Sequence, residues 1–383
     1  METGRQTYKE KLRPTPAQER ALDAVLWRCR ELYNAALEQR ITAWQRGHVS
    51  VSRYQQEAEL KDIRAEMPDY AAIHAHILQD VLARLDKTYQ AFFRRLQRGE
   101  KAGFPRFKGR DRYHSFPFKE YGNGARLDDG CLVLAKSGRI GVHWSRPLAG
   151  TPKTVTISKE ADGWYVAISC ADVPTHPLPS TGQETGIDLG VESFATLADG
   201  TRIHHPRCSR RAERSLAKCQ RRVAGRKKAS QRRRKAVCWL AKAHQTVRRQ
   251  RADFHHKTAL ALVRQYDAIY HEDLPVRNMV RNHHLAKSIT DAGWGAFLSI
   301  LSFKAAKAGR SVVAVDPAFT SQACSGCGVM VQKGLSVCWH TCPDCGTSLH
   351  RDHNAARNIQ WRGQRLRGVP ALAGAVNREP VGL

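Results

Sequence analysis

Apolar side chains recur at helical spacing through the first hundred residues. In residues 15–44 they follow a Thr-Pro start, and in residues 71–96 a second stripe has the same period of three or four residues. A helix with this period buries one face and exposes the other. The pattern predicts a small helical domain over residues 15–98. Its stripes are Leu22, Leu26, Leu32, Ala36 and Ile41, followed by Ile73, Ile77, Val81, Leu85, Tyr89, Phe92 and Leu96.

A period of two residues replaces the helical period further along the chain. In residues 153–170, two alternating apolar and polar runs flank a turn that contains Asp-Gly, which is the pattern of a β-hairpin. A Pro-rich linker follows at residues 172–182, and residues 184–203 predict three more short strands around a second Asp-Gly turn. We therefore expect a β-rich module over residues 130–170 and further strands after the linker.

Helices and strands alternate in the last third of the chain. Residues 254–266 and 291–309 have helical periodicity, whereas residues 267–274 and 311–316 contain short apolar runs followed by acids. This alternation is typical of an α/β unit.

Basic residues outnumber acidic ones by a wide margin. The chain has 63 Lys and Arg against 35 Asp and Glu, which is a formal net charge of +28 at pH 7. Such a balance indicates a polyanionic partner, and nucleic acid before a membrane surface, because each neutralised phosphate releases condensed counterions. Residues 202–251 hold 19 Lys and Arg and one acid, Glu213, on an expected long helical hairpin. That density exceeds what solubility requires, so we expect a surface that contacts phosphates.

A second basic segment mixes aromatic with basic side chains. Residues 99–116 break the helical pattern with Gly and Pro and contain three Phe and a Tyr among Lys and Arg. This composition suits base stacking and phosphate contact. A basic surface loop without a ligand explains the same composition equally well.

Neither export nor a membrane span is expected. The first twenty residues lack an apolar signal region, and no run of eighteen apolar residues occurs. Four of the eleven cysteines cluster in two pairs. In a chain of this kind the pairs indicate metal binding in a reducing compartment.

The cysteine pairs have the spacing of a zinc site. Two C-x2-C pairs are separated by fourteen residues, Cys324 with Cys327 and Cys342 with Cys345. Two such turns can close a tetrahedral shell of four thiolates around Zn²⁺, and a closed shell of this type is structural and not catalytic. Gly328 and Gly346 supply the permissive backbone after each pair. Cys338 lies between the pairs and could replace a ligand, but it has no partner at knuckle spacing, so we leave it out.

Three acidic positions stand at the ends of apolar strands or at the start of a helix. In residues 186–190, Gly-Ile-Asp-Leu-Gly, Asp188 shares one strand face with both glycines. We expect that face to stay empty around the carboxylate, which suits a hydrated divalent cation and a phosphate. Glu272 and Asp273 follow another apolar strand, where either could instead cap a turn. Asp352 precedes a helical run and is, by itself, most simply an N-cap.

The motifs also agree in their order along the chain. They are "GIDLG", "HEDL", "TSQACSGCG…CPDCG" and "RDHNAARNI", preceded by "PTPAQ…CRELYNAAL" and "KAGFPRFK". Together they resemble the TnpB (OrfB-type) proteins of bacterial insertion sequences, which are related to type V CRISPR effector nucleases. The resemblance covers most of the chain and is specific because order and spacing agree together. The family commonly has a second acid just before the last Asp, where this chain has His350 and Arg351.

The resemblance implies an α+β multidomain fold. Its parts would be a split β-barrel (wedge) with an inserted helical recognition domain, and a RuvC-like α/β nuclease domain of the ribonuclease H fold with an inserted zinc ribbon. The corresponding residues here are 1–14 and 105–180 for the wedge-like barrel, 15–104 for the helical domain, 181–319 and 348–383 for the nuclease domain, and 320–347 for the ribbon.

The resemblance also implies the catalytic residues. Asp188, Glu272 and Asp352 match the metal-binding acids of an RNA-guided DNA endonuclease, and Asp273 is left unassigned. Two Mg²⁺ ions roughly 4 Å apart would support phosphodiester hydrolysis, and one Zn²⁺ would occupy the ribbon. Asp188 is expected to bridge the two Mg²⁺ ions because it lies on the central strand. Asp352 could cap its helix and bind metal at once.

The expected partners are a guide RNA from the transposon end and a double-stranded DNA target with a short adjacent motif, in a monomeric ribonucleoprotein without a membrane. The expected location is the bacterial cytoplasm, with association to the nucleoid when DNA is bound. Two rival functions remain: a guided DNA-binding regulator that does not cut, and a transposase that acts directly in strand transfer. The intact set of acids argues against the first rival. The guide, the adjacent motif and the cleavage pattern are not encoded in these motifs.

Overall fold

The computed structural model describes residues 3–110, 112–334 and 337–368. The chain divides into two compact units, Met1–Pro174 and Thr175–Leu383. Parts of the expected barrel, ribbon and nuclease domains, at residues 1–2, 111, 335–336 and 369–383, lie outside the described residues.

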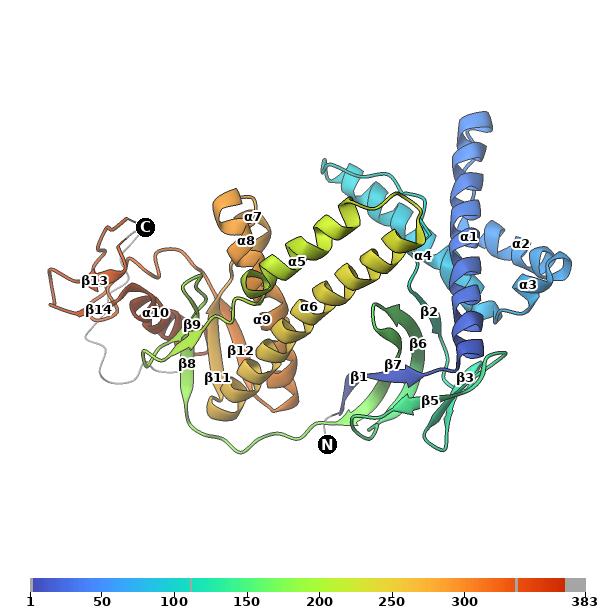
Figure 1. Ribbon diagram of the computed structural model, residues 1–383. Coiled ribbons are helices and arrows are strands. Elements are labelled where there is room, and N and C mark those ends of the chain that lie inside the picture. The colour runs from blue at the N-terminus through green and yellow to red at the C-terminus, as the bar shows by residue number, and fades with distance from the viewer. Residues whose placement is uncertain (1–2, 111, 335–336, 369–383) are drawn as a thin grey trace. The chain divides into compact units, whose positions relative to one another are not determined.

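The first unit contains an antiparallel sheet that curls like a barrel (Figure 1). Its strand order is β2-β6-β7-β1-β5-β4-β3. The first strand lies between the two halves, because β1 pairs with β7 on one side and β5 on the other. The strands are β1 Thr3–Arg13, β2 Ser115–Phe118, β3 Ala125–Asp128, β4 Cys131–Leu134, β5 Gly138–His143, β6 Thr151–Glu160 and β7 Gly163–Pro174.

Between β1 and β2, the described residues contain four inserted helices. They are α1 Pro16–Gly47, α2 Arg53–Glu66, α3 Pro68–Ala71 and α4 Ala75–Gln97. The predicted start of α1 is confirmed: Thr15 is the N-cap and exchanges capping-box hydrogen bonds with Gln18. Most of the predicted stripe residues are buried in one core with the sheet, as Leu22, Val81 and Ile157 illustrate. The end of the second stripe is not, because Leu96 is exposed.

The second unit contains a mixed sheet of order β10-β9-β8-β11-β12. Three of its strands, β8, β11 and β12, are parallel to one another. The other two, β9 and β10, are each antiparallel to the preceding strand. The predicted strands are confirmed. They are β8 Glu184–Asp188, β9 Ser193–Leu197, β10 Arg202–His204, β11 Ala268–Glu272 and β12 Ser311–Val315.

Helices cover both faces of this sheet. Ile187 points into a core with residues of α6, α8 and α9, whereas Tyr270 packs in a smaller core with Ile359 of α10. The helices are α5 Cys208–Ala224, α6 Gln231–Gln265, α7 Val276–Met279, α8 His283–Ala292, α9 Trp294–Lys307 and α10 Arg351–Leu366, and a small hairpin of β13 Trp339–Thr341 and β14 Ser348–His350 precedes α10.

The single helix predicted over residues 291–309 is wrong at its start. Gly293 has φ of 66° and separates α8 from α9. Its N–H donates to the carbonyl oxygen of Ile289, 3.0 Å away, and closes α8. A residue in the left-handed region cannot continue a right-handed helix, so the chain restarts as α9.

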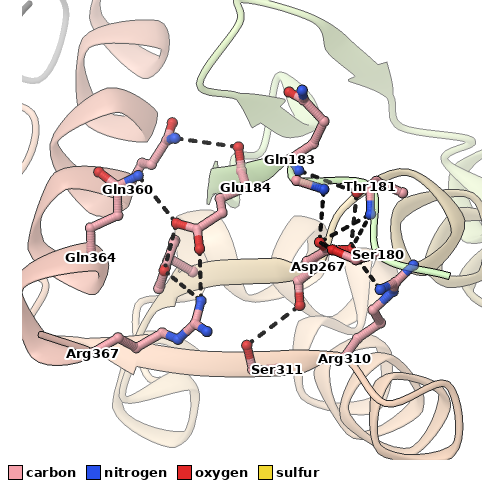
Figure 2. Close-up of polar contacts among 12 residues, drawn as sticks. Ser180, Thr181, Gln183, Glu184, Asp267, Arg310, Ser311, Gln360, Gln364 and Arg367 are labelled. Atoms are coloured by element: carbon pink, nitrogen blue, oxygen red, sulfur yellow. Dashed lines mark hydrogen bonds and ion pairs between the residues drawn. The ribbon is translucent and has the colours of Figure 1, made fainter. Parts of the chain in front are cut away.

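Asp267 anchors the chain where it enters both β8 and β11 (Figure 2). Its carboxylate accepts hydrogen bonds from the Ser180 hydroxyl and from the backbone N–H groups of Thr181 and Gly182, at 2.9 Å for the closest contact of each N–H. Arg310, whose side chain is 4% exposed, forms an ion pair with it. The Ser180 hydroxyl, followed by the backbone N–H of Thr181, lowers the pKa of Asp267 far below its usual value. The linker and two strands are thereby joined at one carboxylate.

Replacing Asp267 by Asn should destabilise the protein by about 2–3 kcal/mol at pH 7, because it leaves the Arg310 charge without its partner. The pKa of Asp267 is lower in the folded than in the unfolded chain, so its contribution is complete above about pH 4 and declines as the pH falls below that value. Urea unfolding of both proteins at pH 7 and at pH 3 measures this difference, which should shrink at the lower pH.

The matched control for this prediction is Asp253→Asn. Asp253 forms an exposed i,i+4 ion pair with Lys257 in α6, in which both side chains are more than half exposed. Its removal should change the unfolding free energy by less than about 1 kcal/mol. Equal effects of the two substitutions would show that Asp267 is not an anchor.

Candidate active site and metal centre

Helix α10 packs very closely against β8 and β11, because glycines lie at the points of contact. A Cβ atom added to Gly186 would lie 2.1 Å from the carbonyl oxygen of Ala356 and 2.5 Å from the backbone nitrogen of Gln360. One added to Gly363 would lie 1.9 Å from the Tyr270 ring. Any side chain at these two positions would push the helix away from the sheet. The prediction that the strand face beside Gly186 stays empty is therefore wrong, because α10 fills it.

The helix runs antiparallel to β8, so its first turn lies beside the end of the strand. Asp352, Ala356 and Gln360 are four residues apart and share one helix face. Asp352 Oδ2 would lie 3.8 Å from a Cβ atom on Gly190. The Asp352 carboxylate thus lies beside Gly190, two residues after Asp188, the last residue of β8.

The opposite end of α10 is held by Glu184 (Figure 2). Its carboxylate accepts hydrogen bonds from Gln364 at 3.1 Å, from the hydroxyl of Tyr270 at 2.9 Å and from Arg367 at 2.8 Å. Gln360 also donates to the Glu184 backbone oxygen at 3.3 Å. These contacts fix the position of the helix along the strand.

The N-cap of α10 is His350, and not Asp352 as the sequence indicated. His350 Nδ1 accepts a hydrogen bond from the backbone N–H of Asp352 at 3.2 Å. Asp352 itself lies in the first turn, where the helix dipole favours a negative charge. Its carboxylate is therefore not occupied in capping the helix.

Asp188, Glu272 and Asp352 interact electrostatically. In the parallel pair β8 and β11, Ile187 lies opposite His271, so the next residues, Asp188 and Glu272, end neighbouring strands. Burial raises the pKa of Asp188 well above its usual range, and the charges of Glu272 and Asp352 raise it further. Burial also raises the pKa of Glu272. A bound cation would relieve this repulsion between like charges.

The three carboxylates are near one another without forming a single tight cluster. In the part of the chain that the structure describes, they are not a group whose ligand atoms all lie within 4.8 Å of one another. One Mg²⁺ ion, with oxygen ligands at about 2.1 Å, could not contact all three in this arrangement. Two ions about 4 Å apart require a wider set of ligands of this kind.

A cavity of about 410 Å³ adjoins Asp352 and Gly190. Three arginines and three acids line it, namely Arg207, Arg210 and Arg351 with Glu192, Asp291 and Asp352. Guanidinium groups bind phosphate oxygens in a planar, bidentate geometry. The cavity therefore combines carboxylates with guanidinium groups that can contact phosphates.

Asp291 of α8 positions the start of α5 at this cavity. It accepts hydrogen bonds from the backbone N–H groups of Ser209, at 2.8 Å, and Arg210, at 3.4 Å. The Arg210 side chain donates to the hydroxyl of Ser288 at 3.0 Å. Arg207 and Arg210 were counted within the basic run 202–251, but the composition of that run could not single them out, because their place depends on α8.

The four cysteines of the two pairs come together. The Sγ atoms of Cys324 and Cys345 are 3.6 Å apart, as are those of Cys327 and Cys342, and all four lie within 4.8 Å of one another. The edge of a zinc-thiolate tetrahedron is about 3.8 Å for Zn–S bonds of about 2.3 Å. This group can therefore hold a metal ion, and it does not include Cys338.

The surroundings of the four cysteines affect their thiols in opposite directions. The hydroxyl and backbone N–H of Thr347 lower the pKa of Cys345 to about 6, whereas burial raises the pKa of Cys327 to about 12. Gly328 and Gly346 have φ of 88° and 70°. Both glycines thus take the left-handed backbone that the sequence predicted for these turns.

Two buried asparagines of α10 tie the cysteine turns to the site. Asn354 donates to the carbonyl oxygen of Ala323 at 2.7 Å and accepts from the N–H of Ser325 at 2.8 Å. Asn358 donates to the carbonyl oxygen of Thr320 at 2.8 Å, and the Thr320 hydroxyl donates to Glu272. Sequence reasoning missed these residues. Their signal was an i,i+4 pair of asparagines in the helix that carries Asp352.

The basic run forms the helical hairpin that the sequence predicted. Helices α5 and α6 lie side by side (Figure 1), although residues 202–204 form β10. The guanidinium of Arg222 lies 5.4 Å from the ring centroid of Trp239, whose side chain is 53% exposed. An exposed aromatic ring among cations offers both stacking and phosphate contact.

The aromatic and basic segment of the first unit is an ordered loop. Its described residues from 99 to 114 form no helix or strand. Asn34 of α1 holds it through two hydrogen bonds to the backbone of Lys108, at 3.0 and 2.7 Å. Phe104 and Phe107 remain exposed.

Within the described residues, no helix is long and apolar enough to cross a membrane.

Three family models match the chain. They are the OrfB model described as "Probable transposase" at residues 167–283, the "Cas12f1-like, TNB domain" at residues 294–359, and an OrfB-type "Helix-turn-helix domain" at residues 1–48. In this structure the described part of the last segment is strand β1 followed by helix α1.

Similar proteins extend over nearly the whole chain. A Streptomyces pristinaespiralis protein named "Putative RNA-guided DNA endonuclease" is 36% identical over 372 residues, which cover 95% of this chain and 90% of that protein. The Escherichia coli K12 protein "Putative RNA-guided DNA endonuclease InsQ" is 29% identical, with 94% and 93% covered.

Among solved structures, the mini-RNA-guided endonuclease CRISPR-Cas_phi3 is similar in fold. The TM-score is 0.50 at 12% sequence identity, and the match covers 93% of this chain and 92% of that one. The matched family models and the 36% identity across nearly the full length lead to one conclusion. The chain belongs to the TnpB (OrfB-type) family.

Proposed function

We propose that this protein is an RNA-guided DNA endonuclease of a bacterial transposable element. The observation that carries the proposal is that Asp188, Glu272 and Asp352 interact at one end of the second sheet, beside a cavity that contains three arginines and three acids. Full-length relatives named as RNA-guided DNA endonucleases support the same function.

The three acids fit a site for two Mg²⁺ ions. They are hard oxygen donors, which Mg²⁺ prefers, and their mutual repulsion is of the kind that divalent cations relieve. When bound, the ions would activate a water molecule and stabilise the departing 3′ oxygen. Asp188 is the residue best placed to bridge them, because it ends the central strand between β11 and β9.

The arginines of the cavity would position the DNA strand. Arg207, Arg210 and Arg351 offer bidentate contacts to phosphates beside Asp352. The basic hairpin of α5 and α6 would carry the longer backbone contacts with guide RNA and target DNA. Both contributions bind phosphate without regard to base sequence.

The four-cysteine group would hold one structural Zn²⁺. Its ligands are Cys324, Cys327, Cys342 and Cys345, which leave no position for a substrate. Asn354 and the neighbouring contacts of α10 join the zinc ribbon to the helix that carries Asp352. A folded ribbon would therefore help to hold the acids in position.

The remaining architecture follows the same assignment. The barrel with its inserted helices would be the wedge and recognition parts, and the second unit the RuvC-like nuclease with its ribbon. The partners would be a guide RNA from the transposon end and a double-stranded target with an adjacent motif, in a monomeric complex within the bacterial cytoplasm.

One observation favours a second candidate function. The family model over residues 167–283 is described as a transposase, and the same acids could support direct strand transfer. A defined bound RNA distinguishes the two functions, because strand transfer needs no guide.

The protein purified from cells that carry its locus should retain one defined RNA through a high-salt wash. The charge of +28 attracts nucleic acid in general, but this attraction falls steeply with salt. A guide RNA that also makes hydrogen bonds and stacking contacts specific to its fold should be retained. Sequencing of the retained nucleic acid tests this. Random DNA fragments alone would favour the transposase.

Asp188→Ala should reduce target cleavage by roughly 1000-fold, because the lost ligand supplies several kcal/mol of transition-state stabilisation. Target binding should persist, since removal of a negative charge cannot weaken attraction to phosphate. The assay combines gel shift and cleavage of a labelled duplex, with and without Mg²⁺. Glu272→Ala and Asp352→Ala should behave alike.

The matched control is Asp273→Ala, which removes the acid next to Glu272 and should retain measurable cleavage. Cleavage at the wild-type rate by Asp188→Ala would refute the catalytic assignment. Equal loss of binding and cleavage would mean that Asp188 maintains the fold.

Cys342→Ser should lower the zinc content and the yield of folded protein together, because a structural zinc ion contributes folding free energy. Elemental analysis and circular dichroism of the purified variant measure both. Cys131→Ser, which removes a thiol in the first unit, is the control. Active wild-type protein without zinc would overturn the assignment.

A further inference from the structure

Cys338, which stands outside the four-cysteine group, belongs to a second set of potential metal ligands. Within the described residues, one ligand atom each of Glu192, Cys338 and His350 lies within 4.8 Å of the other two. Glu192 precedes β9, Cys338 precedes β13, and His350 ends β14 and caps α10. Three separate segments of the chain thus converge on one point.

The backbone around this set is held in place. The N–H of Arg351 donates to the carbonyl oxygen of Cys338 at 2.8 Å. Trp339 pairs with His350 in the hairpin of β13 and β14. The cysteine and the histidine are therefore kept together by secondary structure and not by side-chain rotamers alone.

The donor set has the chemistry of a zinc site with an open position. Thiolate, imidazole and carboxylate are the three protein ligands of Zn²⁺, and three of them leave a fourth position for water. Ligand atoms around tetrahedral zinc lie roughly 3.3–3.8 Å apart, so small rotations suffice. Glu192 and Cys338 are exposed, which gives an ion access from solvent.

His350 links this set to Asp352. In the structure, His350 Nδ1 accepts the hydrogen bond of the Asp352 backbone N–H. A neutral imidazole has one nitrogen with a free lone pair, and a metal ion requires that lone pair. Metal binding by His350 and capping of α10 by His350 therefore exclude each other.

We propose that Glu192, Cys338 and His350 form a second, inhibitory Zn²⁺ site. When Zn²⁺ occupies this site, His350 no longer accepts the hydrogen bond from the backbone N–H of Asp352, and cleavage slows. The inhibitory part rests on the proposed endonuclease function, whereas the binding part does not. An ion here would also join the ribbon to the turn after β8 at the edge of the active site.

Metal content tests the binding part without reference to activity. Full-length protein carrying its structural zinc is titrated with Co²⁺ and with Zn²⁺, and bound metal is counted after gel filtration. The wild type should take up one additional equivalent, and Co²⁺ should add thiolate charge-transfer absorption. Cys338→Ser and Glu192→Gln should weaken uptake at least about 10-fold, whereas Cys131→Ser should not.

Cleavage assays test the inhibitory part. With Mg²⁺ in excess, added Zn²⁺ should inhibit the wild type, and the concentration for half-inhibition should rise at least about 10-fold in Cys338→Ser. Without added zinc, Cys338→Ser should cleave at the wild-type rate. Circular dichroism confirms that each variant is folded, and Glu192→Gln provides a second variant if one of them is not.

Each outcome is decisive. A wild type that binds only one ion, or a Cys338→Ser variant that binds as many ions as the wild type, overturns the site. Equal zinc inhibition of both proteins places the inhibition at the catalytic acids and overturns the mechanism. If neither the wild type nor any variant cleaves under any condition, the proposed endonuclease function is refuted. The number of bound metal ions still tests the second Zn²⁺ site.

Discussion

The close contact between α10 and the second sheet is the constraint on which the rest of the site depends. Gly186 and Gly363 have no Cβ atoms, and only for that reason can the helix backbone reach β8 and the Tyr270 ring. Because α10 runs antiparallel to β8, this contact places Asp352 near the end of the strand that carries Asp188. A larger residue at either glycine would move the helix by more than the tolerance of a metal site.

The same helix connects the cysteine turns to the acids. Asn354 and Asn358 bind the backbone of the segment before and within the first turn, and Thr320 of that segment donates to Glu272. Buried amides of this kind are costly when unpaired, so they hold the two elements in one relative position. A change in the ribbon therefore reaches two of the three acids through short polar contacts.

The main concentrations of positive and negative charge lie on different elements of the second unit. The basic helices α5 and α6 attract a polyanion over a broad surface, whereas the end of the sheet concentrates carboxylates that repel it. The positive charge of the hairpin favours contact with phosphates, whereas the mutual repulsion of the acids is of the kind that cations relieve. The basic run and the three acids thus lie on different elements of this unit.

The sequence by itself determined the elements and the ligand types. Local periodicity specified the two long helices of the first unit, α1 and α4, and the strands of the second. The spacing of the cysteine pairs specified a group that can hold a metal ion, because both signals arise between residues close in the chain. Only the tertiary structure decided which residue caps α10 and why residue 186 must be glycine. It also decided that Cys338 lies beside Glu192 and His350. These features depend on contacts between segments far apart in sequence, which no local pattern encodes.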